Sequence, residues 1–188
     1  AWDSPGSILF AGYVNKITPK LSPQTIELQL TGMEEYTKAR IIGETFNTKI
    51  TDPTKAVDFE AENWQGVMNA MIKRMFDNAL IPNGLPRNPS VLGTVGSSTG
   101  TGKKKTVLIT DALSYGSALK EVSEKDSGLG LEYRFVPRWA SSAKNKVVWD
   151  FVTGTENYPH INEINTVSIT LAENSEKISS WDTTIDSN

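Results

Sequence analysis

The chain of 188 residues carries 19 basic and 22 acidic side chains, and its net charge of −3 gives no overall attraction to nucleic acid. It contains no cysteine, which excludes disulfides, thiolate nucleophiles and cysteine-based zinc sites. Hydrophobic residues at 38% and charged residues at 22% are typical of a folded globular domain, and no apolar run approaches the roughly 20 residues that span a bilayer, so we expect no stable membrane insertion.

The first strands of the chain are predicted to form a β-hairpin. Residues 7–18, SILFAGYVNKIT, alternate in their second half, and PKLSP at 19–23 supplies a turn. In the next strand, TIELQLTG at 25–32, alternate apolar residues share one face: Ile26, Leu28 and Leu30. We therefore expect a hairpin with one buried face.

Two helical segments are predicted next. MEEYTKAR at 33–40 fits one or two turns, and the stretch that follows it, to Pro53, is mixed and is expected to be irregular. The strongest helical period starts near Ala61, with apolar residues at Trp64, Val67, Met68, Met71, Ile72, Met75 and Phe76. Three acidic residues, Asp58, Glu60 and Glu62, are placed at its start and two basic ones, Lys73 and Arg74, near its end. The methionines on this face could line a groove for a cofactor or a partner helix, but at helical spacing they more simply predict that the face packs into the hydrophobic core.

The middle of the chain is predicted to be a long loop followed by a strand and a helix. Residues 82–104 are rich in proline, glycine, serine and asparagine and show no period. KTVLIT at 105–110 predicts a strand, and Asp111 is the expected cap of a helix that continues through Glu124, with Gly128 near its end. The polar stretch GSSTGTGKKKT at 96–106 is expected to be among the least ordered parts of the molecule unless a neighbouring subunit holds it.

The C-terminal part predicts a β-meander. LEYRFVPRW at 131–139 and KVVWDFVTG at 146–154 flank a polar turn, and NTVSITLAE at 165–173 adds a third strand. The predicted fold class is α+β, with antiparallel, barrel-like strands from both ends of the chain and a helix-containing α/β excursion between them. In domain terms, residues 1–43 and 129–188 form a β-rich part, and 44–128 form an inserted part.

The stretch GSSTGTGKKKT at 96–106 imitates two catalytic motifs. A P-loop needs glycine five positions before Gly102 and a hydroxyl after Lys103, but Ser97 and Lys104 stand there. The same stretch matches G-x-S-x-G with Ser98 as the nucleophile of a hydrolase whose base would have to be His160, but it lacks the preceding strand and the following helix. We interpret it as a polar connection in which the lysine run is solvated.

Other chemistry is weakly supported by the sequence. His160 is the only histidine, so a transition-metal site has no second histidine or cysteine to use. A glycosidase pair would have to come from acids such as Asp150 and Glu132, for which a cross-strand charge pair is the simpler reading. We expect no cofactor, no metal and no catalytic residue.

An interaction surface is the more plausible use of the C-terminal strands. Arginines and aromatic residues alternate there and can form a cation–π ladder, a sugar-stacking platform or a sheet edge that packs on another subunit. The candidate residues are Tyr133, Arg134, Arg138, Trp139 and Trp149.

Taken in order, the segments resemble the tail-tip hub family of long-tailed bacteriophages, also called baseplate hub, tail-associated or minor tail proteins. The resemblance is carried by LFAGYVNKIT, by IELQLTGMEEYTKARII with its helix ending in arginine, and by the Trp-bearing helix ENWQGVMNAMIKRMFDN. It continues through TVLITDALSYGSALKEVSEK and the extended pair GLEYRFVPRWASSAKNKVVWDFVTGTE. It covers most of residues 8–172 by pattern and order, without an invariant signature.

The resemblance implies a non-enzymatic structural protein of the virion, made in the bacterial cytoplasm, that joins the tail tube to the receptor-binding tip for host attachment. It implies a homo-trimeric ring with other tail proteins as partners, no small-molecule cofactor and no sequence-specific nucleic acid. The alternative is a carbohydrate-binding or cell-wall-degrading tail-tip module. The first residue, alanine, and the polar end SSWDTTIDSN lead us to expect a piece of a longer chain.

Overall fold

The computed structural model describes residues 8, 11–20, 25–43, 54–77, 80 and 91–161. Its helices are α1 (Met33–Ala39), α2 (Trp64–Met75) and α3 (Tyr115–Glu121), with a 3-10 turn η2 (Ile109–Asp111) and a π-helical turn η3 (Val122–Asp126). Its strands are β1 (Tyr13–Lys20), β2 (Thr25–Thr31), β3 (Ala56–Ala61), β4 (Leu92–Val95), β5 (Lys103–Leu108), β6 (Tyr133–Trp139) and β7 (Val147–Thr153). The predicted α+β class is confirmed.

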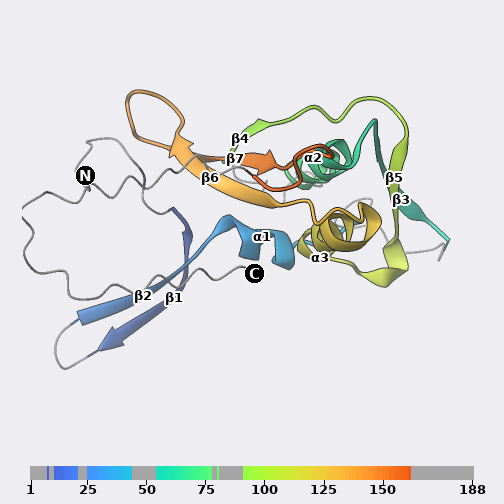
Figure 1. The fold of residues 1–188 in the computed structure, drawn as a ribbon. Coiled ribbons are helices and arrows are strands. Elements are labelled where there is room, and N and C mark those ends of the chain that lie inside the picture. Colours follow the sequence, from blue (N-terminus) through green and yellow to red (C-terminus); the bar gives the residue numbers. More distant parts are fainter. Residues whose placement is uncertain are drawn as a thin grey trace, which may run out of the picture.

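Within the described residues the strands form three open sheets. Strands β1 and β2 pair only with each other, β3 pairs with β5, and β7 lies between β4 and β6. The β4–β7 pair is parallel and the others are antiparallel. Because no sheet closes on itself in this part of the chain, the barrel-like description was wrong. The strands near the two ends of the chain also lie in separate sheets (Figure 1).

Both predicted hairpins are present. The turn between β6 and β7 is closed by the Ala140 N–H, which donates to the carbonyl of Lys146. Strand β1 runs on to Lys20, past the proline that was expected to open its turn, since Pro19 lies opposite Ile26 in the register. The predicted strand at 165–173 lies outside the described residues.

Helix α2 supplies the centre of the core. Its buried apolar residues are fully or almost fully enclosed: Val67, Met68, Met71, Ile72 and Met75. The predicted Met-rich core face is therefore confirmed. The helix starts at Trp64, three residues later than expected, because Asn63 is its N-cap and accepts a hydrogen bond from the Gly66 N–H. The Trp64 N–H donates to the Glu156 carboxylate, 3.2 Å away, so a negative charge lies at the positive end of the helix.

Strand β3 was missed by the sequence analysis. Its side chains alternate between solvent and core, with Val57, Phe59 and Ala61 buried. The acidic residues expected at the start of a helix, Asp58 and Glu60, lie on the exposed face of this strand. A six-residue alternation next to a strong helical period is ambiguous from sequence alone, and pairing with β5 decides it.

The Gly/Ser-rich connection makes hydrogen bonds to β3 and α2 that the sequence analysis did not expect. Strand β4 lies within the stretch predicted to be loop, and the next residues pack on β3 and α2. The Glu62 N–H donates to the Thr99 carbonyl at 3.1 Å, and the Asn69 amide donates to the Ser97 carbonyl at 2.8 Å. Gly100 has a φ of +86°, a conformation that glycine adopts without strain, and it lies against Glu62.

The second predicted helix starts later than expected. Asp111 ends the turn η2, and the N-cap of α3 is Ser114, whose hydroxyl accepts from the Ser117 N–H at 3.1 Å. The chain then widens into the π-helical turn η3 and leaves through Gly128, whose φ is +65°. The predicted glycine at the helix end is confirmed.

The two predicted parts of the chain share contacts. The Ile42 N–H donates to the Leu113 carbonyl, and the Tyr115 N–H donates to the Arg40 carbonyl, which fixes the segment after α1 beside α3. Buried residues of α2, β5, α3, β6 and β7 belong to one hydrophobic cluster. The division of the chain into a β-rich part (1–43 and 129–188) and an inserted part (44–128) stays a prediction.

Candidate interaction surface

The β1–β2 hairpin exposes a row of large apolar side chains. Four of them are between about half and two thirds exposed: Val14 (47%), Ile17 (62%), Ile26 (67%) and Leu30 (49%). We call these four residues the hairpin face. Figure 1 shows the hairpin extending away from the other elements, to which it is joined through α1.

A β-bulge brings these residues onto one side of the ribbon. Val14 lies opposite Leu30 and Ile17 opposite Leu28, while Asn15, between the paired Val14 and Lys16, has no partner in the register. Residues two apart on β2 point to the same side, so Val14 and Ile17 share a side although they are three apart in sequence. In a regular strand Val14 would lie on the same side as Lys16, and nothing in the sequence indicated the bulge.

The expected buried face of this hairpin is therefore exposed. Cross-strand pairing satisfies the facing backbone groups, but no described element covers the apolar side. A two-stranded ribbon is marginally stable alone, and a contiguous exposed apolar patch typically marks an interaction site. The hairpin face is the strongest candidate site among the described residues.

The five candidate residues of the C-terminal strands are not brought together. Register and alternation put Tyr133, Trp139 and Trp149 on the side of the sheet that holds Phe135 and Phe151. Trp149 is only 9% exposed and the Tyr133 ring lies 6.0 Å from that of Phe151, so Trp149 and Tyr133 pack in the core, whereas Trp139 is half-buried at the end of β6. Burial raises the pKa of Tyr133, and the charges of Glu34 and Glu124 add to the effect.

The two arginines lie on the opposite side of that sheet. Arg138 donates from Nε to the Asp150 carboxylate at 2.7 Å, and the other oxygen of Asp150 accepts from the Thr94 N–H at 2.6 Å. Partial burial opposes ionisation of Asp150, but Arg138 and the Thr94 N–H outweigh it and lower the pKa of Asp150. Asp150 thus ties β4 and β6 to the central strand β7, which is a structural role.

The candidate hydrolase residues do not form a nucleophile and base pair. The Ser98 hydroxyl accepts from the Lys73 ammonium at 3.0 Å, in an exposed hydrogen bond, so the burial that turns a lysine into a general base is missing. His160 is exposed in the loop after β7, where the flanking Ile161 N–H donates to Glu132 at 2.7 Å. The geometry therefore offers no activated Ser98.

The lysine run is not simply solvated. Lys103 lies 5.9 Å from the centre of the Trp64 ring, and Lys104 pairs with Asp58 at 2.8 Å. The Lys105 side chain is 15% exposed and contacts the carboxylates of Glu121 at 2.7 Å and Asp126 at 2.8 Å. Burial acts against its charge, but the two carboxylates outweigh it and raise the pKa of Lys105. These contacts tie β5 to β3, α2 and α3.

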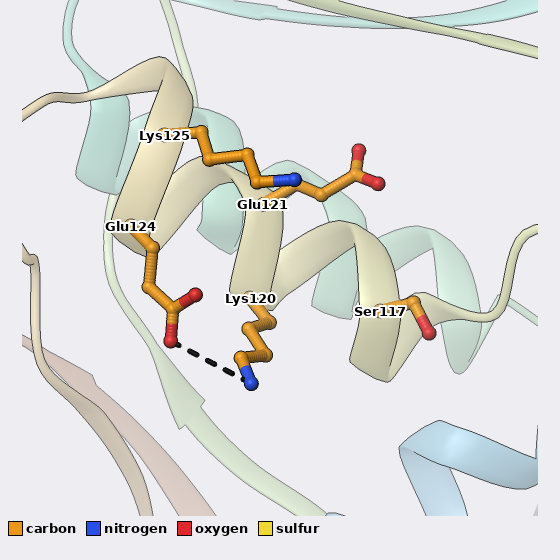
Figure 2. A pocket seen from close by; sticks show the side chains of 5 residues that line it. All are labelled: Ser117, Lys120, Glu121, Glu124 and Lys125. Atoms are coloured by element: carbon orange, nitrogen blue, oxygen red, sulfur yellow. Dashed lines mark ion pairs between the residues drawn. The ribbon is translucent and has the colours of Figure 1, made fainter. Parts of the chain in front are cut away.

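A small pocket is lined by side chains of α3 and η3: Ser117, Lys120, Glu121, Glu124 and Lys125. Figure 2 shows that all five come from one helical segment, with Lys120 paired to Glu124 at 3.7 Å. A catalytic site requires groups that converge from several sides around a substrate. This arrangement does not supply them.

In the described part of the chain, none of the helices combines the length and apolar character needed to cross a membrane, and no group of three His, Asp or Glu side chains is placed to hold a metal ion. Comparison with family models, with curated proteins and with solved structures found no match to this chain.

Proposed function

We propose that the chain is a structural subunit, or part of one, of the tail-tip hub of a long-tailed bacteriophage. In this role it is a non-enzymatic virion component that assembles into a homo-trimeric ring and contacts other tail proteins between the tail tube and the receptor-binding tip. The observation that carries the proposal is the hairpin face, which is apolar, contiguous and not covered by any described element.

The order of the elements supports the same proposal. The resemblance implies an early hairpin, a short helix, a Trp-bearing helix, a strand with a helix, and a final extended pair. These correspond in order to β1–β2, α1, α2, β5–α3 and β6–β7. A hydrophobic core built on α2, with a projecting apolar hairpin, suits a subunit that joins its neighbours through strands.

The hairpin face is the surface that we assign to subunit contact. Fully burying an exposed side chain of this size is worth about 1.5–3 kcal/mol, and because these four are still 47–67% exposed, each gains roughly half of that on association. Cross-strand hydrogen bonds hold them in one register, which limits the ordering cost of association.

The test is a matched pair of charge substitutions on β2. Leu30→Lys puts an ammonium on the hairpin face, while Gln29→Lys puts one on the opposite side of the same exposed strand. We expect the wild type and Gln29→Lys to have the mass of a trimer by light scattering, and Leu30→Lys to be a monomer that keeps the circular dichroism spectrum of the wild type. Ser98→Ala and His160→Ala should also assemble normally.

Three results would contradict the proposal. They are a monomeric wild type at the concentrations found in assembling particles, a Leu30→Lys variant that still forms trimers, or a hydrolytic activity of the wild type that is lost in Ser98→Ala. The alternative of a sugar-binding module depends on an exposed platform at Trp139 and Trp149. Because Trp149 is buried, no described observation favours that alternative.

A further inference from the structure

Helix α3 ends in a turn that is wider than an α-helical turn. The Ser127 N–H donates to the Val122 carbonyl at 3.0 Å, five residues back, whereas an α-helix bonds each N–H to the carbonyl four residues back. π-helical turns of this kind are rare and are often found at functional positions. The same residues have an α-helical alternative, in which the Ser127 N–H would bond to the carbonyl of Ser123.

The wide turn brings two carboxylates to one lysine. Glu121 is the last residue of α3 and Asp126 is the last of η3, and the Lys105 ammonium contacts both, at 2.7 Å and 2.8 Å. At 3.6 residues per turn, side chains five residues apart on an α-helix point about 140° away from each other, so an α-helical turn would carry Asp126 away from Lys105. Because the Lys105 side chain is only 15% exposed, its ammonium relies on these carboxylates in place of water.

The wide turn also leaves the Ser123 carbonyl available to the segment that leads into β6. That carbonyl accepts from the Leu131 N–H at 3.1 Å and from the Ser127 hydroxyl at 2.7 Å, and the Ser123 hydroxyl donates to the Leu131 carbonyl at 2.6 Å. A carbonyl oxygen has two lone pairs, and both are used here.

An α-helical turn would change the partners of the same oxygen. The Ser127 N–H would become a third donor to the Ser123 carbonyl, so one of the two present bonds would be lost. A serine hydroxyl can bond to the carbonyl four residues back within an α-helix, so the Ser127 hydroxyl can stay. The bond from Leu131, which comes from outside the turn, is therefore the one that is lost.

We propose that η3 is a switch between two helical registers. Lys105 holds Val122–Asp126 in the π-helical register through its ion pair with Asp126. The α-helical turn is the commoner conformation, so loss of that ion pair lets the segment close into it. The Ser123 carbonyl then takes up the Ser127 N–H and releases the segment before β6. The charge of a side chain on β5 thereby controls how that segment is held.

The register of η3 also affects the loop after β7 through Glu132, which lies between Leu131 and β6. The Glu132 N–H donates to the Pro159 carbonyl at 2.9 Å, and the Glu132 carbonyl accepts from the Gly154 N–H at 2.8 Å. These bonds hold the loop, and the Glu156 carboxylate of the loop accepts from the first N–H of α2. We expect the release of Leu131 to loosen this loop.

Two matched pairs of substitutions test the switch in the full chain of 188 residues. Asp126→Ala removes the carboxylate that only the wide turn brings to Lys105, and its control is Glu124→Ala, which breaks the exposed ion pair with Lys120. Lys105→Met removes the charge and keeps an unbranched stem. Its control is Lys104→Met, at the neighbouring lysine of the run, which lies on the exposed side of β5.

Scalar couplings across hydrogen bonds, measured by NMR, report the register directly. In the wild type and in both controls the Ser127 nitrogen should couple to the carbonyl carbon of Val122. In Asp126→Ala and Lys105→Met we expect it to couple to the carbonyl carbon of Ser123 instead. Coupling to Val122 that persists in both of these variants would overturn the proposal.

Hydrogen exchange measures the consequence of the change in register. We expect the Leu131 and Gly154 N–H groups to exchange at least tenfold faster in Asp126→Ala and Lys105→Met, while Ile72, fully buried on α2, keeps its rate. Exchange that rises equally at Leu131 and Ile72 in both variants would also overturn the proposal, because it shows a loss of global stability instead. If Lys105→Met does not fold, Asp126→Ala decides, since that side chain is 29% exposed.

Discussion

Val14 lies directly opposite Leu30 across the β1–β2 ribbon, and their side chains are 47% and 49% exposed. A cross-strand apolar pair stabilises the ribbon by about 0.2–1 kcal/mol, whether or not its outer side is covered. About half of each side chain still faces solvent, and Ile17 and Ile26 are more exposed. The pair therefore helps to hold the ribbon together and also forms part of a surface.

The hairpin face should bind a hydrophobic dye when the protein is dilute enough for its subunits to be dissociated, because the face is then exposed to solvent. We expect the double variant Ile17→Thr with Ile26→Thr to lower the fluorescence of anilinonaphthalene sulfonate and to leave the melting temperature within a few degrees. Threonine keeps the β-branched shape and adds a hydroxyl, so the strands persist while the apolar area falls. Leu108→Thr, at a residue 40% exposed on β5, is the control and should lower the signal less. Equal loss in both variants would show that the dye does not report on the hairpin.

Truncation of the central helix should be costly. Met68 is fully buried on α2, so Met68→Ala leaves a cavity, and we expect it to lower the free energy of unfolding by about 2–5 kcal/mol. Met68→Leu keeps the volume and should cost less than about 1.5 kcal/mol. Lys73→Ala, on the exposed side of the same helix, should change stability by about 0.5 kcal/mol or less. Urea denaturation followed by circular dichroism measures all three.

Gly154 should not tolerate a side chain. A Cβ placed there would overlap the carbonyl of Pro159, which the loop after β7 brings close. We expect Gly154→Ala to destabilise the protein by about 1–3 kcal/mol, the cost typical of overpacking, because a backbone group has to move. At Gly43 a Cβ would meet no atom within 4 Å, so Gly43→Ala should be close to neutral. Similar melting temperatures for the two variants would contradict this explanation.

The charge of Asp150 should contribute to stability in a pH-dependent way. Its pKa is lowered in the folded protein by Arg138 and the Thr94 N–H, against the effect of burial. The contribution is therefore present above the unfolded pKa of about 4 and is lost as the pH falls through the lower folded pKa. Asp150→Asn keeps an acceptor for the Thr94 N–H, but it removes the charge and places an amide NH2 where Arg138 Nε has its acceptor.

We expect Asp150→Asn to be less stable than the wild type at pH 7 by about 1 kcal/mol or less, since Arg138 is 44% exposed. The difference should shrink when urea denaturation is repeated at progressively lower pH, below about pH 4. The variant Asp58→Asn is a useful comparison, because Lys104 and Thr106 also lower the pKa of Asp58. A difference for Asp150→Asn that grows toward low pH would have the wrong sign and would exclude the charge as its cause.

The sequence predicted best the elements in which apolar residues recur with a regular spacing or in a continuous run. The apolar residues of α2 recur at helical spacing, so local pattern and burial agree there, whereas β7 is recognised by its continuous apolar run, in which the neighbouring Val148 and Trp149 are both buried. Strand β3 was missed, although its alternation is regular. Its acidic residues also suit the start of a helix, and only the pairing of Phe59 opposite Lys105 decides between the two.

The candidate site was less predictable, because it depends on register. The interaction residues proposed on β6 and β7 alternate across the sheet, and the side that carries Trp149 packs into the core. No local signal says which face of a strand another part of the chain will cover. The same reason explains the hairpin, whose apolar side was expected to be buried.

By itself, the sequence determined the α+β class, the Met-rich core helix, the two hairpins and the failure of the GSSTGTGKKKT stretch as a P-loop, because spacing and residue type are local properties. Tertiary structure decided which faces are covered. It placed the Gly/Ser connection within hydrogen-bonding distance of Asn69 and Glu62, buried Trp149, and left the hairpin face exposed on one side of a ribbon with a bulge at Asn15. Which face of a strand is covered depends on contacts between residues far apart in the chain, and a local sequence pattern carries no information about those contacts.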